Sequence, residues 1–497
     1  MSILLVPRAE QYGERPAIVA TEGSFTYRQL LEASGRVAAF LLNGSQDLNE
    51  RPVAFLAPQG FHYVALQWGI WRAGGIAVPL SLFHPRPELE YVIDDTKPAV
   101  VVAHPDFADL VGPIAAERGL RFGTSPEALA HAPGPLPAVT PARRAMILYT
   151  SGTTGKPKGV VSTHENIAAQ ITSLVGAWGW TENDRILEFL PLHHIHGIVN
   201  VIACALWVGA VCEIIPRFEA QMVWERIAQG GLTLFMAVPT VYVKLIDAWE
   251  KAAPAERQRM SAGCRGVRLM ISGSAALPVP ILEKWQEISG HVLLERYGMT
   301  EIGMGLSNSL LGKRYPGCVG TPLPGVEAKV VDEAGQPVEP LAPGEIVVRG
   351  KTVFLEYWGR PKETQKAFRD GWFLTGDVAV VESGIFRILG RSSVDIIKTG
   401  GYKVSALEIE EVLLTHPDIK EVAVVGVPDQ VWGERIVAAL VLREGATLTT
   451  ESLRAWGKER LATYKVPKEA VIIEELPRNA MGKVSKPDLK KTIGARP

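Results

Sequence analysis

The stretch that most constrains this chain is a loop rich in glycine, hydroxyl and lysine residues, residues 149–159 (YTSGTTGKPKG). It directly follows residues 145–148 (AMIL), an apolar run typical of the end of a buried strand. Glycines let backbone N–H groups approach a ligand closely, while the hydroxyls and lysines add donors and positive charge, so the loop suits a polyphosphate. A Walker A loop has a different spacing, and Pro157 stands where the helix of such a loop would begin. We therefore expect a phosphate-binding loop; the alternative is a Gly/Thr-rich surface turn.

Length and composition are typical of a soluble globular enzyme with either more than two ordinary domains or one large domain plus an appendage. The chain has 497 residues, of which 47% are hydrophobic and 21% charged, and its net charge of -1 gives no sign of a nucleic-acid or membrane partner. Its 4 cysteines are widely spaced without a Cys-x-x-Cys pair, which argues against a disulfide framework or zinc site. Because we find no presequence and no apolar run long enough to span a bilayer, we expect a cytoplasmic protein. The oligomeric state is not indicated.

The order of strand-like and helix-like runs predicts the fold class. Over residues 15–140 the two kinds of run alternate, which is typical of an α/β architecture with a mostly parallel sheet. Thr26 is predicted to cap one helix, and either Thr163 or Ser162 is predicted to cap another that runs to Trp178. Residues 317–390 change to short β-like runs separated by glycines, which indicate a small barrel or meander. We expect a large N-terminal domain (residues 1–391) of α/β sheets plus a small β-barrel-like subdomain. A small, mobile α+β C-terminal domain (residues 392–497) is expected to follow it.

Three further segments place polar or small residues after predicted strands. Residues 272–276 (SGSAA) form a small-residue turn against which a flat ring could lie, although tight packing explains it equally well. Residues 295–301 (ERYGMTE) follow the strand predicted at 292–294, at an edge where open α/β sheets bind ligands. Glu301 would be a natural Mg²⁺ ligand beside a polyphosphate. Asp377 could accept both hydroxyls of a ribose, or could simply form a turn.

Residues 193–196 (HHIH) bring three histidines together. Neither a carboxylate nor a cysteine accompanies them at ligand spacing, so the run favours a structural histidine pair, with one ring lining a cavity, over a metal site. Near the C-terminus, residues 476–486 (LPRNAMGKVSK) form a basic loop. Such a loop is usually a solvated surface, unless its domain can swing against the phosphate site.

Taken as a set, these motifs resemble those of the adenylate-forming superfamily, which includes acyl-CoA synthetases, peptide-synthetase adenylation domains and firefly-type luciferases. Residues 149–159 look like its phosphate loop and residues 297–301 like its adenylate motif. Residues 375–377, 390–391 and 477–483 look like its ribose, hinge and terminal-lysine motifs, in the family's order. Within the superfamily the chain most resembles the malonyl-CoA synthetases, on residues 193–197, 236–245, 294–301 and 394–404.

The resemblance implies a two-step reaction in which a carboxylic acid reacts with ATP to form an acyl-adenylate, which coenzyme A then converts to a thioester. Lys483 would bridge the carboxylate and the α-phosphate, and Thr300 would contact that phosphate. The imidazole ring of His194 would lie as a gate between the acid pocket and the coenzyme A tunnel. Glu301 and Thr150 would hold Mg²⁺. The other residues implied to bind the nucleotide or coenzyme A, together with Thr150, are Ser151, Gly152, Thr153, Thr154, Gly155, Lys156, Lys158, Gly273, Ser274, Ala275, Ala276, Tyr297, Asp377, Arg391, Lys398 and Gly401.

The hinge departs from the family pattern. Members often carry Asp or Lys two residues after the motif arginine, where this chain has Ser393. The loop up to residues 400–401 also looks one residue longer than in many relatives. Either Ser393 or Val394 could therefore be the pivot, because a hinge residue needs only to absorb the backbone rotation.

The residue before Tyr297 faces the acid pocket in this family, and here it is Arg296. A guanidinium there disfavours an alkyl tail and can pair with a second carboxylate, which predicts a short dicarboxylic acid, malonate first and methylmalonate second. The implied acid-binding residues are His194, Lys244, Ser272, Arg296 and Met299. In the alternative, Arg296 turns away to pair with Glu295 or another acid. The alternative functions are a medium-chain fatty or aryl acid–CoA ligase, an adenylation enzyme that loads a carrier protein, and a non-catalytic nucleotide-binding module.

Overall fold

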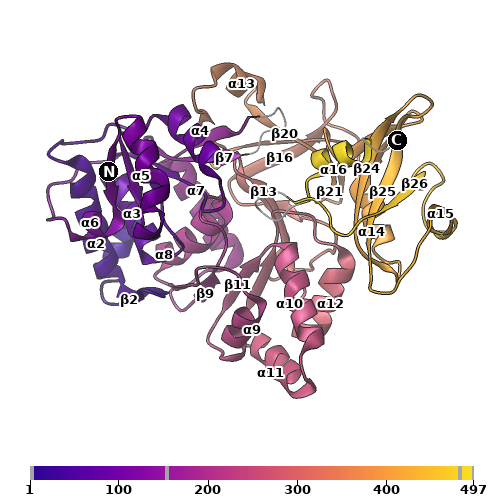
Figure 1. Cartoon of the computed structure of the whole chain (residues 1–497), viewed down its shortest axis with the longest axis horizontal. Coiled ribbons are helices and arrows are strands. Elements are labelled where there is room, and N and C mark those ends of the chain that lie inside the picture. Colours follow the sequence, from indigo (N-terminus) through magenta and orange to yellow (C-terminus); the bar gives the residue numbers. More distant parts are fainter. Residues whose placement is uncertain (1–4, 151–155, 479–483, 495–497) are drawn as a thin grey trace.

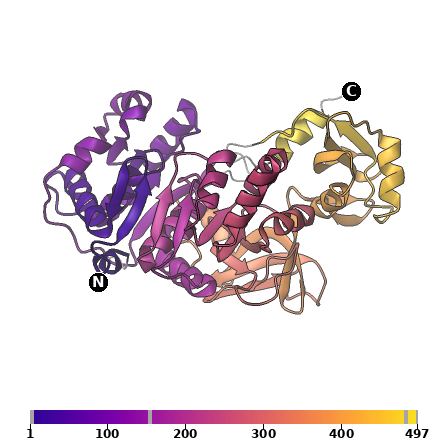
Figure 2. The same cartoon turned by 90° about the horizontal axis from the view of Figure 1, so that it is seen from below.

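The computed structural model describes residues 5–150, 156–478 and 484–494. The chain runs from the N-terminal sheets at one end of the molecule, through a central antiparallel sheet, to a small C-terminal domain at the other end (Figures 1 and 2). Within the described residues, no helix is both long enough and apolar enough to cross a membrane. The α/β class with a large N-terminal part and a small C-terminal part is the one expected.

A seven-stranded sheet carries the phosphate-binding loop. In order across the sheet, its strands are β18 (Glu356–Tyr357), β8 (Lys158–Thr163), β7 (Arg144–Thr150), β4 (Ile76–Pro79), β3 (Pro52–Leu56), β5 (Val100–Ala103) and β6 (Arg121–Thr124). The strands from β7 to β6 are parallel, whereas β8 and β18 are added antiparallel. A strand rather than a helix therefore follows Pro157, and residues 151–155 at the tip of the loop lie outside the described residues.

A nine-stranded sheet lies beside the first and carries the other ligand-binding edge. In order across the sheet, its strands are β15 (Thr321–Pro322), β14 (Gly303–Ser307), β13 (Leu294–Met299), β12 (Leu269–Ser272), β11 (Leu234–Ala237), β9 (Arg185–Glu188), β10 (Val211–Ile214), β1 (Pro16–Ala20) and β2 (Gly23–Thr26). The strands from β13 to β1 are parallel, which confirms the mostly parallel arrangement.

The strand that carries Arg296 is longer than expected. The sequence placed residues 295–301 after a strand end, but β13 continues to Met299 because Arg296 and Tyr297 pair with Ser307 and Leu306 of β14. Both side chains are thus fixed by strand geometry, on opposite faces of the sheet. Only Thr300 and Glu301 follow the strand.

Helices cover both sheets, and two of them begin where the sequence predicted. Thr26 caps α2 with Gln29, and Thr163 caps α7 with Asn166, each in a reciprocal capping box. The helices of the large domain are α1 (Leu5–Glu10), α2 (Tyr27–Leu42), α3 (Phe61–Arg72), α4 (Arg86–Thr96), η1 (Pro105–Phe107), α5 (Ala108–Glu117), α6 (Ser125–Ala130), α7 (His164–Trp178), the π-helix η2 (His196–Ala203), α8 (Cys204–Val208), α9 (Ala220–Ala228), α10 (Pro239–Lys251), α11 (Pro254–Cys264), α12 (Val279–Ser289) and α13 (Pro361–Lys366).

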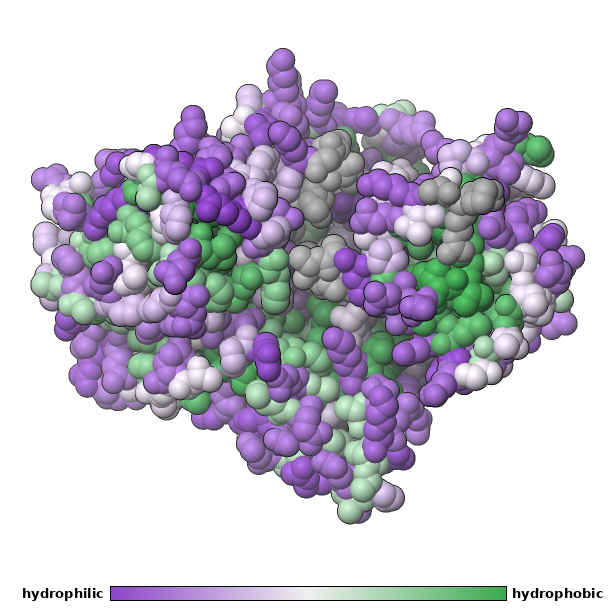
Figure 3. All heavy atoms as spheres, in the orientation of Figure 1, coloured by the Kyte–Doolittle hydropathy of each residue, from purple (hydrophilic) through white to green (hydrophobic). Residues whose placement is uncertain are grey.

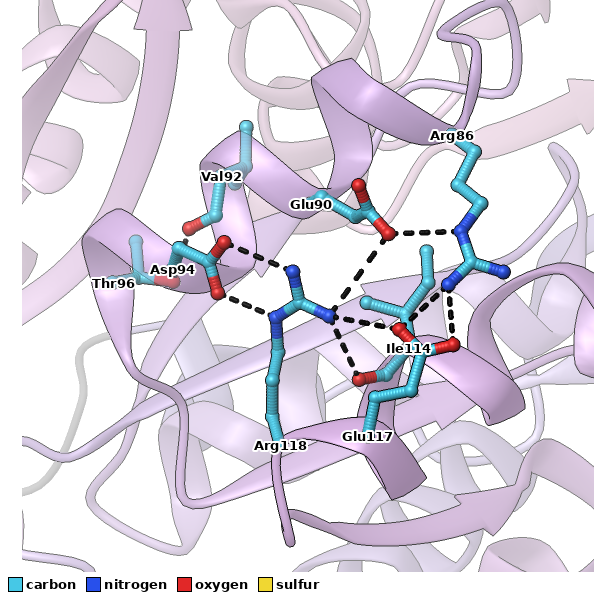
Figure 4. A network of polar contacts seen from close by, with 8 residues as sticks. All are labelled: Arg86, Glu90, Val92, Asp94, Thr96, Ile114, Glu117 and Arg118. Carbon is cyan, nitrogen blue, oxygen red and sulfur yellow. Dashed lines mark hydrogen bonds and ion pairs between the residues drawn. The ribbon is translucent and has the colours of Figure 1, made fainter.

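Helix α4 is held on α5 by a surface network of charges (Figure 4). Arg118, just after α5, contacts Asp94 and Glu90 of α4, and Arg86 of α4 reaches Glu90 and Glu117. The network holds α4 against α5. The same helix carries Tyr91 and Asp95, which contact the phosphate-loop segment.

The glycine-rich middle of the chain forms a five-stranded antiparallel sheet. Its strands are β16 (Val326–Val331), β17 (Gly344–Gly350), β19 (Phe368–Arg369), β20 (Trp372–Glu382) and β21 (Ile385–Arg391). In this sheet Asp377 of β20 lies directly opposite Arg391 of β21. The pairing brings two residues predicted to bind ribose side by side.

The small domain has its own sheet and core, and hydrophobic side chains gather on its visible face (Figure 3). Its elements are β22 (Ile396–Thr399), β23 (Tyr402–Ser405), α14 (Ala406–Leu413), β24 (Ile419–Asp429), β25 (Gly433–Leu442), α15 (Thr450–Lys458), β26 (Glu469–Ile472) and α16 (Lys486–Gly494).

Asp395 joins the small domain to the end of β21. One of its carboxylate oxygens accepts the Arg391 N–H at 3.0 Å, and the other lies 2.6 Å from the ammonium of Lys486.

Candidate active site

Two side chains predicted to bind the nucleotide, those of Tyr297 and Arg391, converge on the carboxylate of a third predicted residue, Asp377. The hydroxyl of Tyr297 donates to Oδ2 of Asp377 at 2.6 Å, and Nε of Arg391 donates to Oδ1 at 3.0 Å. The backbone N–H of Asp377 in turn donates to the Thr375 hydroxyl at 3.1 Å. Burial, followed by the nearby Asp377 carboxylate, raises the pKa of Tyr297 well above its ordinary value, so the phenol stays a donor. The arrangement holds Asp377 in a fixed position as an acceptor.

The carboxylate of Glu301 lies beside the phosphate-loop strand. Tyr357 of β18 donates its hydroxyl to Oε1 of Glu301 at 3.0 Å, and the ammonium of Lys158 lies 5.1 Å from the centre of the Tyr357 ring. Burial raises the pKa of the Glu301 carboxyl, and the hydrogen bond from Tyr357 opposes that shift. Tyr357 therefore connects two residues assigned to the phosphates and the metal.

Both ends of the phosphate loop are tied to α4. At the start of the loop, Tyr149 donates to Asp95 at 2.6 Å, and Arg360 donates to the same carboxylate at 3.0 Å. At the far end, Tyr91 donates to the carbonyl of Pro157 at 2.8 Å. These anchors could not be identified from the sequence, because their partners stand 54, 66 and 265 positions apart along the chain.

Arg296, which is predicted to face the acid, is packed against the backbone of Gly273. A Cβ atom at Gly273 would lie only 2.7 Å from Cζ of Arg296, so this close approach requires glycine. Nη2 of Arg296 donates to the Ser274 hydroxyl at 3.3 Å, and that hydroxyl lies 3.4 Å from Nδ1 of His196. Arg296 is 3% exposed, and its Nε and Nη1 atoms are buried without a hydrogen-bond partner among the described residues.

Glu295 does not neutralise Arg296. Its carboxylate accepts the N–H of Gly317 at 3.0 Å, on the opposite face of β13, and burial raises its pKa to about 8. Burial also lowers the pKa of Arg296 to about 9, so its guanidinium is still charged at neutral pH. The alternative in which Arg296 pairs with Glu295 is therefore wrong. A buried cation is left against the small-residue turn of residues 272–276.

Ser274 has a backbone φ of 69°, in the left-handed region that few residues other than glycine adopt. Its hydroxyl links His196 to Arg296, which gives a reason for serine at a position that favours glycine. His196 opens the π-helix η2, and such helices are frequent at functional sites. The sequence analysis had singled out the HHIH run but assigned only His194.

The remaining predicted residues divide into three groups. Ser272 is fully buried at the end of β12, while His194, Met299 and Thr300 are half-buried near the same edge. Lys244 is exposed on α10, with its ammonium 5.8 Å from the Phe218 ring, and Lys398 and Gly401 lie in the β22–β23 hairpin of the small domain. Among the described residues, no hydrogen bond or ion pair joins these last three to Arg296, Glu301 or Asp377. The predicted residues that lie outside the described ranges are Ser151, Gly152, Thr153, Thr154, Gly155 and Lys483.

The predicted ligands fit Mg²⁺ better than zinc. In the part of the chain that the structure describes, no three His, Cys, Asp or Glu side chains could together hold a metal ion. Mg²⁺ instead takes one or two protein oxygens plus phosphate oxygens and water. Glu301 provides a buried carboxylate with acceptor capacity beyond its bond to Tyr357, and Thr150 ends β7 at the start of the phosphate loop.

Comparisons with known proteins show the family of the chain. The sequence profile described as AMP-binding enzyme matches residues 5–358, and the profile described as AMP-binding enzyme C-terminal domain matches residues 408–483. The chain is 48% identical to the mitochondrial malonate–CoA ligase of mouse (Mus musculus), over 99% of this chain and 91% of that protein.

Two solved structures of MatB from Rhodopseudomonas palustris, both 34% identical to the chain, were compared with it. The ATP-bound form gives a TM-score of 0.93 over 100% of this chain and 99% of that one. The apo form gives 0.81, over 99% of each chain.

Proposed function

We propose that this chain, which belongs to the AMP-binding enzyme family, is a malonate–CoA ligase that converts malonate, ATP and coenzyme A into malonyl-CoA, AMP and pyrophosphate. The family matches cover both parts of the chain, and several relatives along nearly its whole length are named malonate–CoA ligases. The acid specificity is argued from the site itself.

The observation that carries the choice of acid is the buried guanidinium of Arg296, which has no ion-pair partner among the described residues. A buried charge without a partner costs several kcal/mol, so a pocket that contains one favours an anionic ligand group. The carboxylate that reacts with ATP must point toward the nucleotide, so the anion at Arg296 would be a second carboxylate. A short dicarboxylate such as malonate supplies both ends, whereas an alkyl or aryl tail would leave the cation unpaired.

The first step needs charge neutralisation more than covalent help. One malonate carboxylate oxygen bonds to the α-phosphorus of ATP, and the bond from that phosphorus to the bridging oxygen breaks, so that pyrophosphate leaves with the electron pair. The described residues Lys156, Lys158 and Arg391 supply positive charge around the nucleotide, and Thr300 would donate to the α-phosphate. We assign the bridging ammonium at the reacting oxygens to Lys483.

Mg²⁺ would be held by Glu301 and Thr150, where it would neutralise charge on the phosphate oxygens. In the nucleoside part of the site, the Asp377 carboxylate would accept the ribose hydroxyls. Gly273, Ala275 and Ala276 would face Tyr297 across the adenine.

The second step requires the small domain to turn. The thiol sulfur of coenzyme A attacks the acyl carbon of malonyl-AMP, and AMP leaves. Lys398 and Gly401 would then line the pantetheine path, with His194 between the path and the acid. The higher TM-score to the ATP-bound than to the apo MatB structure supports assigning the present arrangement to the first step. The turn would occur at Ser393 or Val394, next to the Asp395 anchor.

Two further assignments remain predictions. The vertebrate relatives are named mitochondrial, so a cytoplasmic location for this chain rests on its sequence alone. A medium-chain or aryl acid–CoA ligase is the second choice of function, and a carrier-loading adenylation enzyme is the third.

An acid panel tests the proposal. Purified protein is incubated with ATP, Mg²⁺, coenzyme A and malonate, methylmalonate, octanoate or benzoate, and both thioester and AMP are measured. We expect malonyl-CoA and AMP in equal amounts, with octanoate and benzoate inactive. Formation of octanoyl-CoA or benzoyl-CoA in preference would overturn the choice of acid. Acylation of a carrier's phosphopantetheine with no reaction on free coenzyme A would identify a carrier-loading enzyme.

A further inference from the structure

Tyr357 lies where the phosphate-loop strand meets the segment that holds Glu301. It belongs to β18, and Tyr357 pairs with Val160 of β8, two residues after Lys158. Its hydroxyl donates to Glu301 at 3.0 Å and the ammonium of Lys158 lies 5.1 Å from its ring centre. One side chain therefore contacts two groups that arrive from different sheets.

The backbone around Tyr357 is held at several points. The Leu355 and Trp358 N–H groups donate to the carbonyls of Val161 and Gly159, at 2.9 and 2.7 Å. The Tyr357 N–H donates to the Thr364 hydroxyl at 3.0 Å. The ring packs against Phe354, with centroids 4.8 Å apart, and only 9% of Tyr357 is exposed. The side chain consequently has little freedom to move away from Glu301.

The same segment also holds the backbone of Glu301. The Phe354 N–H donates to the Glu301 carbonyl at 2.7 Å. Tyr357, three residues further along the chain, donates to the Glu301 carboxylate. Glu301 is thus fixed at both its main chain and its side chain by one short strand and the residues before it. A carboxylate placed in this way needs little reorganisation to bind a cation.

We propose that Tyr357 is a positioning residue that sets the distance and orientation between the Glu301 carboxylate and the Lys158 ammonium at the phosphate end of the nucleotide site. The inference rests on the proposed adenylation function. Tyr357 acts through two parts: the hydroxyl orients the metal-binding carboxylate, and the ring face holds the ammonium by a cation–π contact. The two parts make separable predictions.

The hydroxyl is tested with Tyr357→Phe, which keeps the ring. ATP binding is measured by calorimetry without acid or coenzyme A, once with Mg²⁺ and once with a chelator. We expect Mg²⁺-dependent ATP binding to weaken about tenfold, the size of one lost hydrogen bond to a charged group, with little change in metal-free binding. The matched control is Tyr27→Phe, because Tyr27 is also buried and its hydroxyl donates to a carbonyl outside the site, that of Ala210. This control should bind ATP as the wild type does.

The ring is tested with Tyr357→Leu, which should weaken metal-free ATP binding a further two- to fivefold through loss of the Lys158 contact. Tyr357→His keeps a ring and an N–H donor, so its Mg²⁺ dependence should lie between those of the wild type and Tyr357→Phe. Tyr357→His also tests the proposal if Tyr357→Phe does not fold. The proposal would be overturned if the Mg²⁺ dependence of ATP binding were unchanged from wild type in a folded Tyr357→His but fully lost in Glu301→Gln.

A double-mutant cycle separates positioning from general destabilisation. In a Glu301→Gln background, Tyr357→Phe should have no further effect on Mg²⁺-dependent binding, since its target is already gone. Equal weakening with and without Mg²⁺, or additive effects in the cycle, would contradict the proposal. These binding measurements need no acid substrate. A failure of the malonate assignment in the acid panel would therefore leave their outcome intact.

Discussion

Asp377 and Arg391 face each other on adjacent strands, β20 and β21, and the Arg391 guanidinium donates to the Asp377 carboxylate at 3.0 Å. Tyr297 donates to the other oxygen of the same carboxylate. Arg391, the last residue of the central antiparallel sheet, thus binds the Asp377 carboxylate that is proposed to hold the ribose. Arg391 also lies immediately before the residues at which the small domain would turn.

Replacing Asp377 should impair nucleotide binding much more than an exposed ion pair in the same sheet. Asp377→Ala removes the proposed ribose acceptor and leaves Tyr297 and Arg391 without their partner. We expect the dissociation constant for ATP to rise about 10- to 100-fold, since hydrogen bonds to a charged group are lost. Glu327→Ala is the matched control, because Glu327 also pairs across strands, with Arg349, but is exposed. Calorimetry with ATP decides, and binding within twofold of wild type in Asp377→Ala would refute the assignment.

Arg296 should reduce the stability of the ligand-free protein. Because its guanidinium is buried and largely unpaired, we expect Arg296→Met to raise the free energy of unfolding by about 1–4 kcal/mol. Malonate should raise the melting temperature of the wild type but not of this variant. Arg268 is paired with Asp184, so Arg268→Met should be destabilising. Calorimetric melting of the three proteins checks the contrast, and a lower melting temperature in Arg296→Met would argue that an internal partner balances its charge.

Glu295 should make stability depend on pH. Burial raises the pKa of the Glu295 carboxyl to about 8 in the folded chain, against an ordinary value near 4.5. Between these two pH values the folded state therefore keeps the proton, whereas the unfolded state releases it. The resulting stabilisation is fully present below pH 4.5 and is lost as the pH rises toward 8. Relative to Glu295→Gln, the wild type should therefore lose on the order of 3 kcal/mol between pH 5 and 8. Urea unfolding at several pH values measures this difference, and a constant difference would mean that Glu295 is ionised when folded.

The anchor of the phosphate loop should matter more than the surface network beside it. Asp95 accepts from both Tyr149 and Arg360, so Asp95→Asn should lower stability by about 1–3 kcal/mol and also weaken ATP binding. Arg118→Ala breaks the charge network of Figure 4, where exposed pairs contribute less than about 1 kcal/mol, and should leave ATP binding unchanged. Thermal melting in low and high salt, together with ATP titrations, distinguishes the effect of Asp95→Asn from that of Arg118→Ala. An equal effect of both variants on ATP binding would show that α4 acts as a whole rather than through Asp95.

Local patterns predicted much of the fold. The capping residues Thr26 and Thr163 begin helices as expected, and the apolar runs became parallel strands. Periodicity could not show that β13 extends through Arg296 and Tyr297, because its length depends on pairing with β14. The extension matters for function, since strand alternation separates Arg296 from Glu295.

The site was predictable where its residues stand in contiguous motifs. Asp377, Arg391, Tyr297 and Glu301 were named from the sequence, and the structure brings them close together. Tyr357, Asp95 and His196 were missed because their roles depend on contacts between distant segments, which one sequence does not reveal. Lys244 was predicted to bind the acid from its place on a helix. In the structure it lies on the exposed face of α10.

Arg296 is proposed to select a second carboxylate, and the sharpest test compares two acids that differ only at that group. The specificity constants for malonate and propionate are measured in the wild type, in Arg296→Ala, and in Lys244→Ala as the control. We predict that Arg296→Ala lowers kcat/KM for malonate by about 100-fold or more, with propionate unchanged or improved and Lys244→Ala close to the wild type. A malonate preference that survives in Arg296→Ala would contradict the account.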